Sequence, residues 1–371
     1  MANEIGIQAK GNKFYLNGNE IGGSGSDGGS SLTLQPAQLV LPKYMDVAVG
    51  RQCDFFLDDY LINPYGLEVR YGLPDAYPNA DGVYLYDRGH LRITAASAGT
   101  LNLTVNTYCG DDLIGSQTLK IRKSARTGYT GTKNILIVGD SLVDYPSYLS
   151  PNPRETYTLL NEDGDVTINQ IGTQGKTFGD VKVNHEGYGG KTWAWFVTSN
   201  ESPFVNNGVF SFATYMSENF PNINGIDYCI VMLGTNDTPS TIETYSKRFI
   251  DKLTEEYPNC KVAVGIPALT AKLNGVSSSA KATSLLHIGK NYIDWFDDGK
   301  YKSNVTCIGQ GCWIDRENDY PSGTKTANPY ATNTIKYFTD SVHPSLSSNQ
   351  GYKQWGRAVY CKIRAWIAGS L

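Results

Sequence analysis

The hydrophobic and polar positions follow two different patterns, which meet near residue 130. Before that point, short apolar and β-branched runs are separated by glycine, proline, asparagine and aspartate. After it, continuous apolar runs alternate with longer stretches in which apolar residues recur every three or four positions. The first pattern is typical of antiparallel strands, and the second of alternating strands and helices. The sequence therefore predicts an all-β region followed by an α/β region.

Residues 1–31 form a separate segment ahead of the all-β region. The pattern Lys13–Ile21 predicts a β-hairpin that turns at Asn17-Gly18, and Gly22–Ser31 is a Gly/Ser linker. An isolated hairpin is only marginally stable in water. We therefore expect residues 1–31 to attach the chain to further copies of itself or to a larger particle, with an expression remnant as the alternative.

Residues 32–125 contain about seven short runs with the character of strands. Two of them, Leu101–Val105 and Thr118–Ile121, alternate apolar and polar residues as half-buried antiparallel strands do. The number and spacing of the runs predict a small Ig-like β-sandwich without catalytic residues, in which His90 is a surface strand residue. The runs are Gln38–Leu41, Asp46–Val49, Leu67–Tyr71, Val83–Tyr86, Leu91–Ala95, Leu101–Tyr108 and Leu113–Ile121.

Residues 133–371 predict an open α/β sheet. The apolar run Ile135–Val138 is typical of a buried parallel strand, and Tyr228–Leu233 and Lys261–Ile266 are two further strands. Polar motifs follow the first two of these strands, at the sheet edge where such folds place their sites. We expect Asp298–Phe338 to form loops over that edge. The predicted helices are Phe210–Asn219, Thr241–Tyr257, Lys281–Phe296 and Gln350–Ala368.

Composition and charge narrow the class of protein. Of the 371 residues, 40% are hydrophobic and 39 are glycine, which suits a globular protein of two or three domains. The net charge of −4, without a basic stripe, argues against nucleic acid as a partner. We expect no membrane span, and no secretion signal is visible at residues 1–6. An extracellular or virion-associated location is favoured.

The seven cysteines are irregularly spaced, and their number is odd. Cys307 and Cys312 are close enough in sequence for a small loop-closing disulfide, and two unpaired thiols are an equal alternative. No second Cys or His pair stands nearby at ligand spacing, so a zinc site is not expected.

Ser141 is the candidate nucleophile. In Gly139-Asp140-Ser141-Leu142 it directly follows the buried strand, where a tight turn can expose a hydroxyl group at the start of a helix. The alternative is that Ser141 only caps this helix.

His343 is the candidate base. In Asp340-Ser341-Val342-His343-Pro344, a carboxylate three residues before the imidazole can accept Nδ1–H and leave Nε2 free to take the serine proton. A surface histidine is the alternative. Asn236, in Gly234-Thr235-Asn236-Asp237, offers an amide donor for an oxyanion, or else simply forms a turn. The loop at Gly189-Gly190 offers a backbone N–H with little steric cover.

These four blocks resemble, in order and spacing, those of the SGNH (GDSL-like) hydrolases, over about residues 133–371. The stretch His185–Trp193 looks like that of carbohydrate esterases in the family. The resemblance implies a flavodoxin-like three-layer α/β/α fold and a catalytic triad of Ser141, His343 and Asp340. It also implies an oxyanion hole formed by the N–H groups of Ser141 and Gly190 and the side chain of Asn236. No metal or organic cofactor is implied.

The expected activity is that of a carboxylic ester hydrolase. The resemblance favours O-acetyl groups on a carbohydrate as substrate, with lipids and short soluble esters next. Trp193, Trp195 and Trp313 could form an aromatic wall for a sugar, or belong to the core. The alternative functions are a carbohydrate-binding protein and a structural protein of the phage tail or head fibre type, both on the same fold.

Overall fold

The structure is a computed structural model. It describes residues 7–10, 13–16, 19–22, 38–62, 69–72, 83–85, 90–109, 112–144, 151–179, 181–273, 276–277, 280–326, 334–345 and 351–369.

The N-terminal segment contains a small antiparallel sheet of three strands, β1 (Ile7–Lys10), β2 (Lys13–Leu16) and β3 (Asn19–Gly22). Strands β2 and β3 pair on either side of residues 17–18, so the predicted hairpin is confirmed. Strand β1 was not predicted, because Ile7–Lys10 contains only two apolar residues. The turn itself and most of the Gly/Ser linker lie outside the described residues, and the attachment role stays a prediction.

The all-β region forms two main sheets. One has the order β6-β10-β9 and the other β5-β12-β11-β8, with β5 and β12 parallel and the other neighbours antiparallel. Each of the seven predicted runs overlaps a strand, whereas β6 and β7 were not predicted. The Ig-like arrangement stays a prediction. The strands are β4 (Gln38–Leu39), β5 (Tyr44–Ala48), β6 (Gln52–Phe56), β7 (Leu61–Ile62), β8 (Val69–Gly72), β9 (Val83–Leu85), β10 (His90–Thr94), β11 (Gly99–Cys109) and β12 (Asp112–Ser124), with a 3₁₀ helix η1 (Leu57–Tyr60) before β7.

The second region is built on a seven-stranded sheet with the order β15-β16-β13-β19-β20-β23, in which β14 also pairs with β13. All neighbours are parallel except β15 and β16. The predicted mixed α/β fold with a parallel sheet is confirmed. We number the parallel strands by their order in the chain and count β14 and β16, which both pair with β13, as the second. The strand order across the sheet is then 2-1-3-4-5. The strands are β13 (Thr132–Gly139), β14 (Thr167–Ile171), β15 (Gln174–Phe178), β16 (Val181–Gly187), β19 (Tyr228–Met232), β20 (Lys261–Gly265) and β23 (Val305–Ile308).

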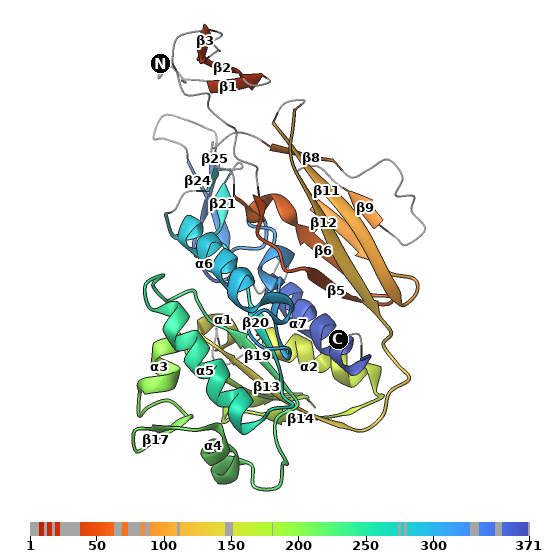
Figure 1. The fold of residues 1–371 in the computed structure, drawn as a ribbon, viewed down its shortest axis with the longest axis vertical. Coiled ribbons are helices and arrows are strands. Elements are labelled where there is room, and N and C mark those ends of the chain that lie inside the picture. The colour runs from red at the N-terminus through yellow and green to blue at the C-terminus, as the bar shows by residue number, and fades with distance from the viewer. Residues whose placement is uncertain are drawn as a thin grey trace.

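Helices cover both faces of this sheet (Figure 1). Ile135 and Ile137 of β13 belong to one core cluster, together with residues of α2 and α7. Leu136 and Val138 belong to the other, together with residues of α3, α4 and α5. The four predicted helices are confirmed to within two residues at each end, whereas α2 and α3 were not predicted. The helices are α1 (Ser141–Asp144), α2 (Pro151–Asp163), α3 (Trp193–Thr198), α4 (Phe212–Asn219), α5 (Ile242–Glu256), α6 (Ala280–Phe296) and α7 (Gly351–Ile367).

The stretch 298–338 is less loop-like than predicted. Val305–Ile308 is buried and forms β23 of the main sheet, and it was missed because the polar Thr306 interrupts its apolar run. The rest of the described part of this stretch contains most of one 3₁₀ helix, a second 3₁₀ helix and an antiparallel pair of strands. The remaining short elements are β17 (Val205–Asn206), β18 (Val209–Phe210), β21 (Lys272–Leu273), β22 (Val276–Ser277), η4 (Asp297–Gly299), η5 (Gln310–Trp313), β24 (Ser322–Thr326) and β25 (Thr334–Phe338).

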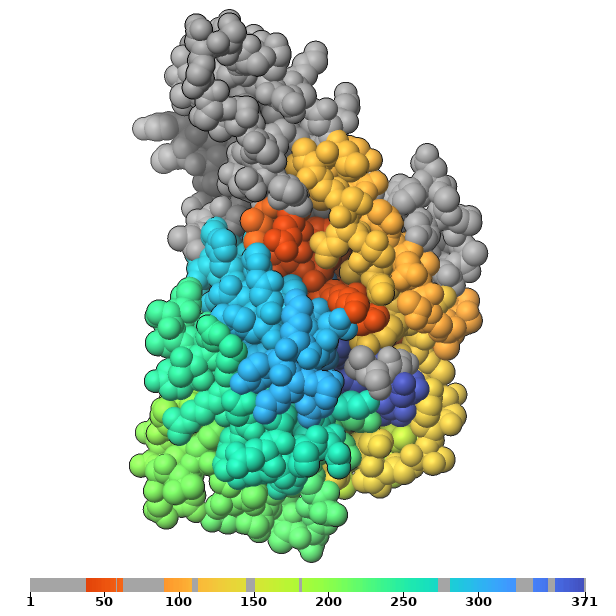
Figure 2. Space-filling model, in the orientation of Figure 1, coloured from red at the N-terminus to blue at the C-terminus, as the bar shows by residue number. Residues whose placement is uncertain are grey.

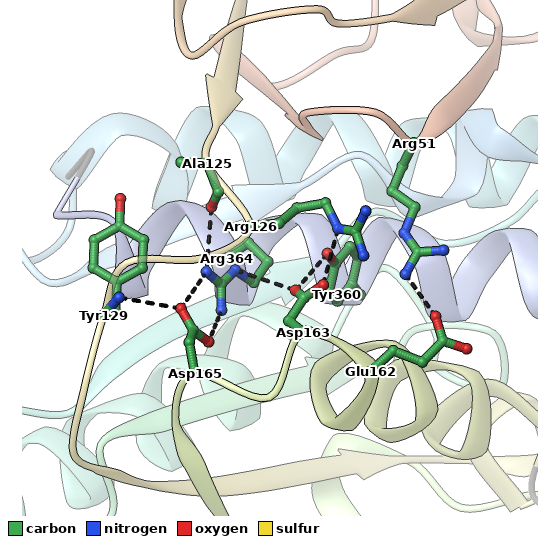
Figure 3. A network of polar contacts seen from close by, with 9 residues as sticks. All are labelled: Arg51, Ala125, Arg126, Tyr129, Glu162, Asp163, Asp165, Tyr360 and Arg364. Atoms are coloured by element: carbon green, nitrogen blue, oxygen red, sulfur yellow. Dashed lines mark hydrogen bonds and ion pairs between the residues drawn. The ribbon is translucent and has the colours of Figure 1, made fainter.

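The two regions pack directly on each other (Figure 2). One buried apolar cluster contains residues from both, among them Val47 and Phe55 from the first and Ala358 and Tyr360 from α7. The connection between β12 and β13 is also fastened to α7 (Figure 3). Arg364 donates to the carbonyl oxygen of Ala125 and to the carboxylate of Asp165. The predicted domain boundaries stay predictions.

Six of the seven cysteines are buried free thiols: Cys53, Cys229, Cys260, Cys307, Cys312 and Cys361. Cys307 Sγ lies 3.2 Å from the carbonyl oxygen of Tyr292, and Cys312 Sγ lies 2.9 Å from that of Gly309. Of the two alternatives for this pair, the structure therefore has two unpaired thiols.

Candidate active site

Ser141 is the first residue of α1 and is separated from the end of β13 by Asp140 alone. The turn between them is tight: a Cβ on Gly139 would lie 2.3 Å from Val143 Cγ2 and 2.9 Å from the carbonyl oxygen of Met232. The capping bond of this helix comes from Asp140, whose Oδ1 accepts a 2.9 Å hydrogen bond from the N–H of Leu142. Ser141 is therefore not the capping side chain, and its hydroxyl is available for another partner.

That partner is His343, 202 residues away in the sequence. His343 Nε2 lies 2.9 Å from Ser141 Oγ, and Nδ1 lies 2.8 Å from Asp340 Oδ2. With Nδ1–H donating to the carboxylate, Nε2 can accept the serine proton. The structure thus brings together the three side chains that the sequence proposed as a triad.

Asp340 is held by its own loop. Its Oδ1 accepts hydrogen bonds from the N–H of Val342 at 2.8 Å and of His343 at 3.0 Å. Partial burial raises the pKa of Asp340. These two N–H groups and the imidazole of His343 lower the pKa by more than burial raises it, so the net shift is downward. The carboxyl group therefore stays ionised at neutral pH, as an acceptor for Nδ1–H must.

The two other predicted blocks meet beside Ser141. Asn236 Nδ2 lies 3.2 Å from Asp140 Oδ2 and 3.3 Å from the carbonyl oxygen of Lys191. It thus contacts the immediate neighbours of both Ser141 and Gly190. Gly190 has a φ of +75°, and a Cβ there would meet nothing within 4 Å, so its surroundings are open. The two hydrogens of the Asn236 amide are therefore both directed at neighbours of these two residues.

Asn236 lies between two carboxyl groups, the buried one of Asp140 and the half-buried one of Asp237, to which the sequence assigned no role. Asp140 is completely buried, which raises its pKa to about 7 despite the hydrogen bonds that it accepts from Leu142 and Thr235. Asp237 Oδ1 accepts from the N–H of Trp193 at 3.1 Å, and burial raises the pKa of Asp237 to about 6. The only feature of the sequence that could have pointed to these two carboxyl groups is that Asp140 precedes Ser141 and Asp237 follows Asn236.

The predicted aromatic wall is wrong for two of its three tryptophans. Trp193 is fully buried, and its Nε1 donates to the hydroxyl of Tyr292 at 2.6 Å. Trp313 is 3% exposed and packs edge-on against Phe55, with 4.9 Å between ring centroids. Both belong to the core, the alternative noted from the sequence. Trp195 is half-buried, with the ammonium group of Lys191 4.8 Å from its ring centroid.

His90 belongs to a different site from the triad. Its Nε2 lies 2.8 Å from Asp54 Oδ1, and its ring stacks on Phe56 at 4.5 Å. This agrees with a strand residue near the surface.

Within the described residues, no three His, Cys, Asp or Glu side chains are grouped so that they could hold a metal ion. None of the helices in the described part of the chain combines the length and apolar character needed to cross a membrane.

No protein-family model and no curated protein matches this chain. Several solved structures are similar at low identity. A mutant acetyl esterase with an acetate ion is 14% identical, with a TM-score of 0.42, and the match covers 64% of this chain and 100% of that one. A carbohydrate esterase family 3 protein from Talaromyces cellulolyticus is 15% identical, with a TM-score of 0.40 and coverages of 63% and 98%. The aryl esterase of M. smegmatis is 16% identical, with a TM-score of 0.35 and coverages of 63% and 99%.

Proposed function

We propose that this chain is a serine esterase of the SGNH type. The observation that carries the proposal is the continuous hydrogen-bonded series from Ser141 Oγ through the imidazole of His343 to the carboxylate of Asp340, at 2.9 and 2.8 Å. Such a series activates a hydroxyl for attack on a carbonyl carbon. A protein that only bound carbohydrate would have no need of it. We also propose that residues 133–371 form a hydrolase domain with a flavodoxin-like fold and that residues 32–125 form an Ig-like domain.

The reaction proceeds in two halves. His343 Nε2 takes the proton of Ser141 as Oγ attacks the ester carbonyl, and the imidazolium then gives that proton to the leaving alcohol. The resulting acyl-enzyme is hydrolysed by a water molecule that His343 activates in the same way. Asp340 keeps the imidazole in the required tautomer and stabilises its charged form throughout.

Negative charge on the carbonyl oxygen is stabilised in both halves by the N–H groups of Ser141 and Gly190 and by the amide of Asn236. Two observations support these assignments. Asn236 Nδ2 is held beside both blocks by Asp140 and by the carbonyl oxygen of Lys191, and the surroundings of Gly190 are open. Because Nδ2 has two hydrogens, donation from Asn236 to the oxyanion would replace or share one of these two contacts.

For the substrate we propose O-acetyl esters on a carbohydrate. This assignment rests on the resemblance of the four blocks to those of SGNH hydrolases, on the likeness of His185–Trp193 to the carbohydrate esterases among them, and on the β domain that precedes the hydrolase domain. Trp195, half-buried beside the loop that carries Gly190, is the one predicted tryptophan left to contact a sugar.

The test is hydrolysis of p-nitrophenyl acetate and of acetylated xylan by the wild-type chain and by Ser141→Ala. Ser217→Ala, at an exposed serine on α4, is the matched control. We expect activity and labelling by a fluorophosphonate probe in the wild type and the control, and neither in Ser141→Ala. Undiminished hydrolysis by Ser141→Ala, or absence of both hydrolysis and labelling in the wild type, would contradict the serine mechanism.

A further inference from the structure

The 3₁₀ helix η1 of the all-β region fits against the segment that follows β20. The hydroxyl of Tyr60 donates a 2.9 Å hydrogen bond to the carbonyl oxygen of Pro267, and Tyr60 is 1% exposed. A Cβ on Gly311 would lie only 2.1 Å from that hydroxyl. The absence of a side chain at Gly311 therefore lets Tyr60 reach the segment.

Asp59, the neighbour of Tyr60, binds the same segment through charge. Its Oδ1 lies 2.6 Å from Lys272 Nζ and 3.2 Å from Arg316 Nη1, and its side chain is 3% exposed. Arg316 in turn donates from Nε to the carbonyl oxygen of Thr270 at 2.6 Å. The backbone N–H of Lys272 donates to the carbonyl oxygen of Arg316 at 3.1 Å. One buried carboxylate from the all-β region thus holds residues 270–272 in place, directly through Lys272 and indirectly through Arg316.

Residues 270–272 hold the loop that carries the proposed base. The N–H of Ala271 donates a 2.9 Å hydrogen bond to the carbonyl oxygen of Ser341, the residue directly after Asp340 and two before His343. Ala271 is 1% exposed, so water does not compete readily for this bond. A second contact of the same kind joins the N–H of Ser345 to the carbonyl oxygen of Asp319 at 2.5 Å.

We propose that Asp59 is a positioning residue for Asp340 and His343, and that the all-β region braces the catalytic loop. This inference rests on the proposed function. The hydrogen bond between His343 and Ser141 allows little displacement, because a shift of about 1 Å in a catalytic group can cost about 10²-fold in rate. A series of contacts fixes the position of the loop that carries His343 relative to Ser141. It runs from Asp59 through Arg316 and Thr270–Ala271 to Ser341.

A second charged connection between the two regions provides a matched control. Asp46 is also buried, with its side chain 5% exposed. It accepts from Arg122 at 2.7 and 2.8 Å and from Lys362 of α7 at 3.0 Å. Within the described residues, no hydrogen bond joins Lys362 to the loop that carries His343. Loss of the Asp46 charge should therefore weaken the packing between the regions without displacing the catalytic loop.

The experiment compares Asp59→Asn with Asp46→Asn in the full chain. Both substitutions keep the size of the side chain and remove its charge. Well below the melting temperature of either variant, we expect Asp59→Asn to lower kcat on p-nitrophenyl acetate about tenfold or more, with KM changed less than about twofold. Asp59→Glu should recover part of the lost kcat, and Asp46→Asn should keep kcat within about twofold. If Asp59→Asn keeps the wild-type kcat, or if both Asn variants lose kcat equally, the inference is overturned.

Amide hydrogen exchange provides a readout that does not depend on esterase activity. In Asp59→Asn, we expect faster exchange in peptides covering 266–272 and 339–345, and in Asp46→Asn no change there. Unchanged exchange in Asp59→Asn would overturn the brace even if the wild type hydrolysed none of the esters tested. If Asp59→Asn does not fold, Tyr60→Phe removes only the hydrogen bond to Pro267 and is measured in the same two ways.

Discussion

The side-chain amide of Asn236 lies 3.2 Å from the buried carboxyl group of Asp140, the residue just before Ser141. This contact holds Asn236 in place before any substrate binds. The carbonyl oxygen of Lys191 accepts from the same amide, so an oxyanion would have to displace or share one of the two contacts. The contribution of Asn236 should therefore be seen in the transition state, where the charge on the oxygen is greatest, more than in substrate binding.

Removal of the Asn236 amide should lower kcat with little effect on KM. For Asn236→Ala we expect a loss in kcat on the order of 10²-fold to 10³-fold, the usual effect of one oxyanion donor. Steady-state kinetics on p-nitrophenyl acetate measure the loss. Asn206→Ala, which removes an exposed amide bound to Glu218, is the control. A change confined to KM would mean that Asn236 binds substrate without stabilising the oxyanion.

Asp340→Asn should almost abolish turnover while the chain stays folded. An amide cannot accept Nδ1–H as a carboxylate does without a change of tautomer or orientation, and a loss of up to about 10⁴-fold is expected. The matched control is Asp54→Asn, since Asp54 holds His90 at the same 2.8 Å in the all-β region. Comparable losses in the two variants would mean that the Asp340 effect is not specific to catalysis.

The pH dependence of kcat/KM in the wild type should contain more than one ionisation between pH 5 and 8. Burial raises the pKa of Asp140 to about 7 and that of Asp237 to about 6, and these two groups flank Asn236. The pKa of Asp340 is lowered from its usual value of 3.8, so this group is ionised across pH 5 to 9. The value of kcat/KM should fall toward pH 5, because Asp140 and Asp237 take up protons and because a protonated imidazole cannot act as a base. A rate that stays constant down to pH 5 would contradict this expectation.

Asp319→Asn should stabilise the chain at alkaline pH. Burial raises the pKa of Asp319 from 3.8 to about 7, so between about pH 4 and 7 the folded state holds a proton that the unfolded state has lost. Stability therefore falls as pH rises through this window. An amide cannot ionise, and the gain in free energy of unfolding over the wild type should grow by about 3 kcal/mol between pH 4.5 and pH 8.

The same substitution should leave the main contact of Asp319 in place. Its Oδ2 accepts from the N–H of Asp315 at 2.8 Å, whereas Oδ1 has no hydrogen-bond partner among the described residues. Urea unfolding at several pH values measures the effect. Glu201→Gln, with a side chain that is 79% exposed, is the control and should show no comparable trend. A pH-independent difference for Asp319→Asn would show that Asp319 is ionised in the folded state throughout.

Substitution of the three tryptophans considered for a sugar site should affect stability at two of them and substrate binding at the third. Trp193→Ala and Trp313→Ala remove core side chains and should each lower the free energy of unfolding by about 3–5 kcal/mol. Trp195→Ala should cost less stability. It should raise KM for acetylated xylan while leaving KM for p-nitrophenyl acetate nearly unchanged. Equal effects of Trp195→Ala on both substrates would argue against contact with a sugar.

The sequence predicted those parts of the fold that local pattern determines. Strands β13, β19 and β20 are apolar on both faces, and α5 and α7 repeat their apolar residues at helical spacing, so neighbouring residues were sufficient. The four-residue strand β23 and the helix α2, which begins at Pro151 and has Pro153 in its first turn, carry no such pattern. They are fixed by tertiary contacts with the sheet and with α7.

The candidate site could be predicted because its residues lie in short motifs with recognisable chemistry. Asp59 was missed for the opposite reason: its partners Lys272 and Arg316 lie more than 200 residues away, and Asp59 belongs to no motif. The two buried tryptophans were uncertain because a large aromatic residue suits a core as well as a sugar site. Only the neighbours of each ring distinguish the two.

The helix α7 joins the two regions although it comes late in the sequence. It packs on β5 of the all-β region and on α2 of the α/β region, and Arg364 binds the carbonyl oxygen of Ala125 in the connection between them. Removal of residues 351–369 would leave Ser141, Asp340 and His343 in the chain and expose the apolar faces that α7 buries. The stability of both regions therefore depends on one helix that carries none of these three residues.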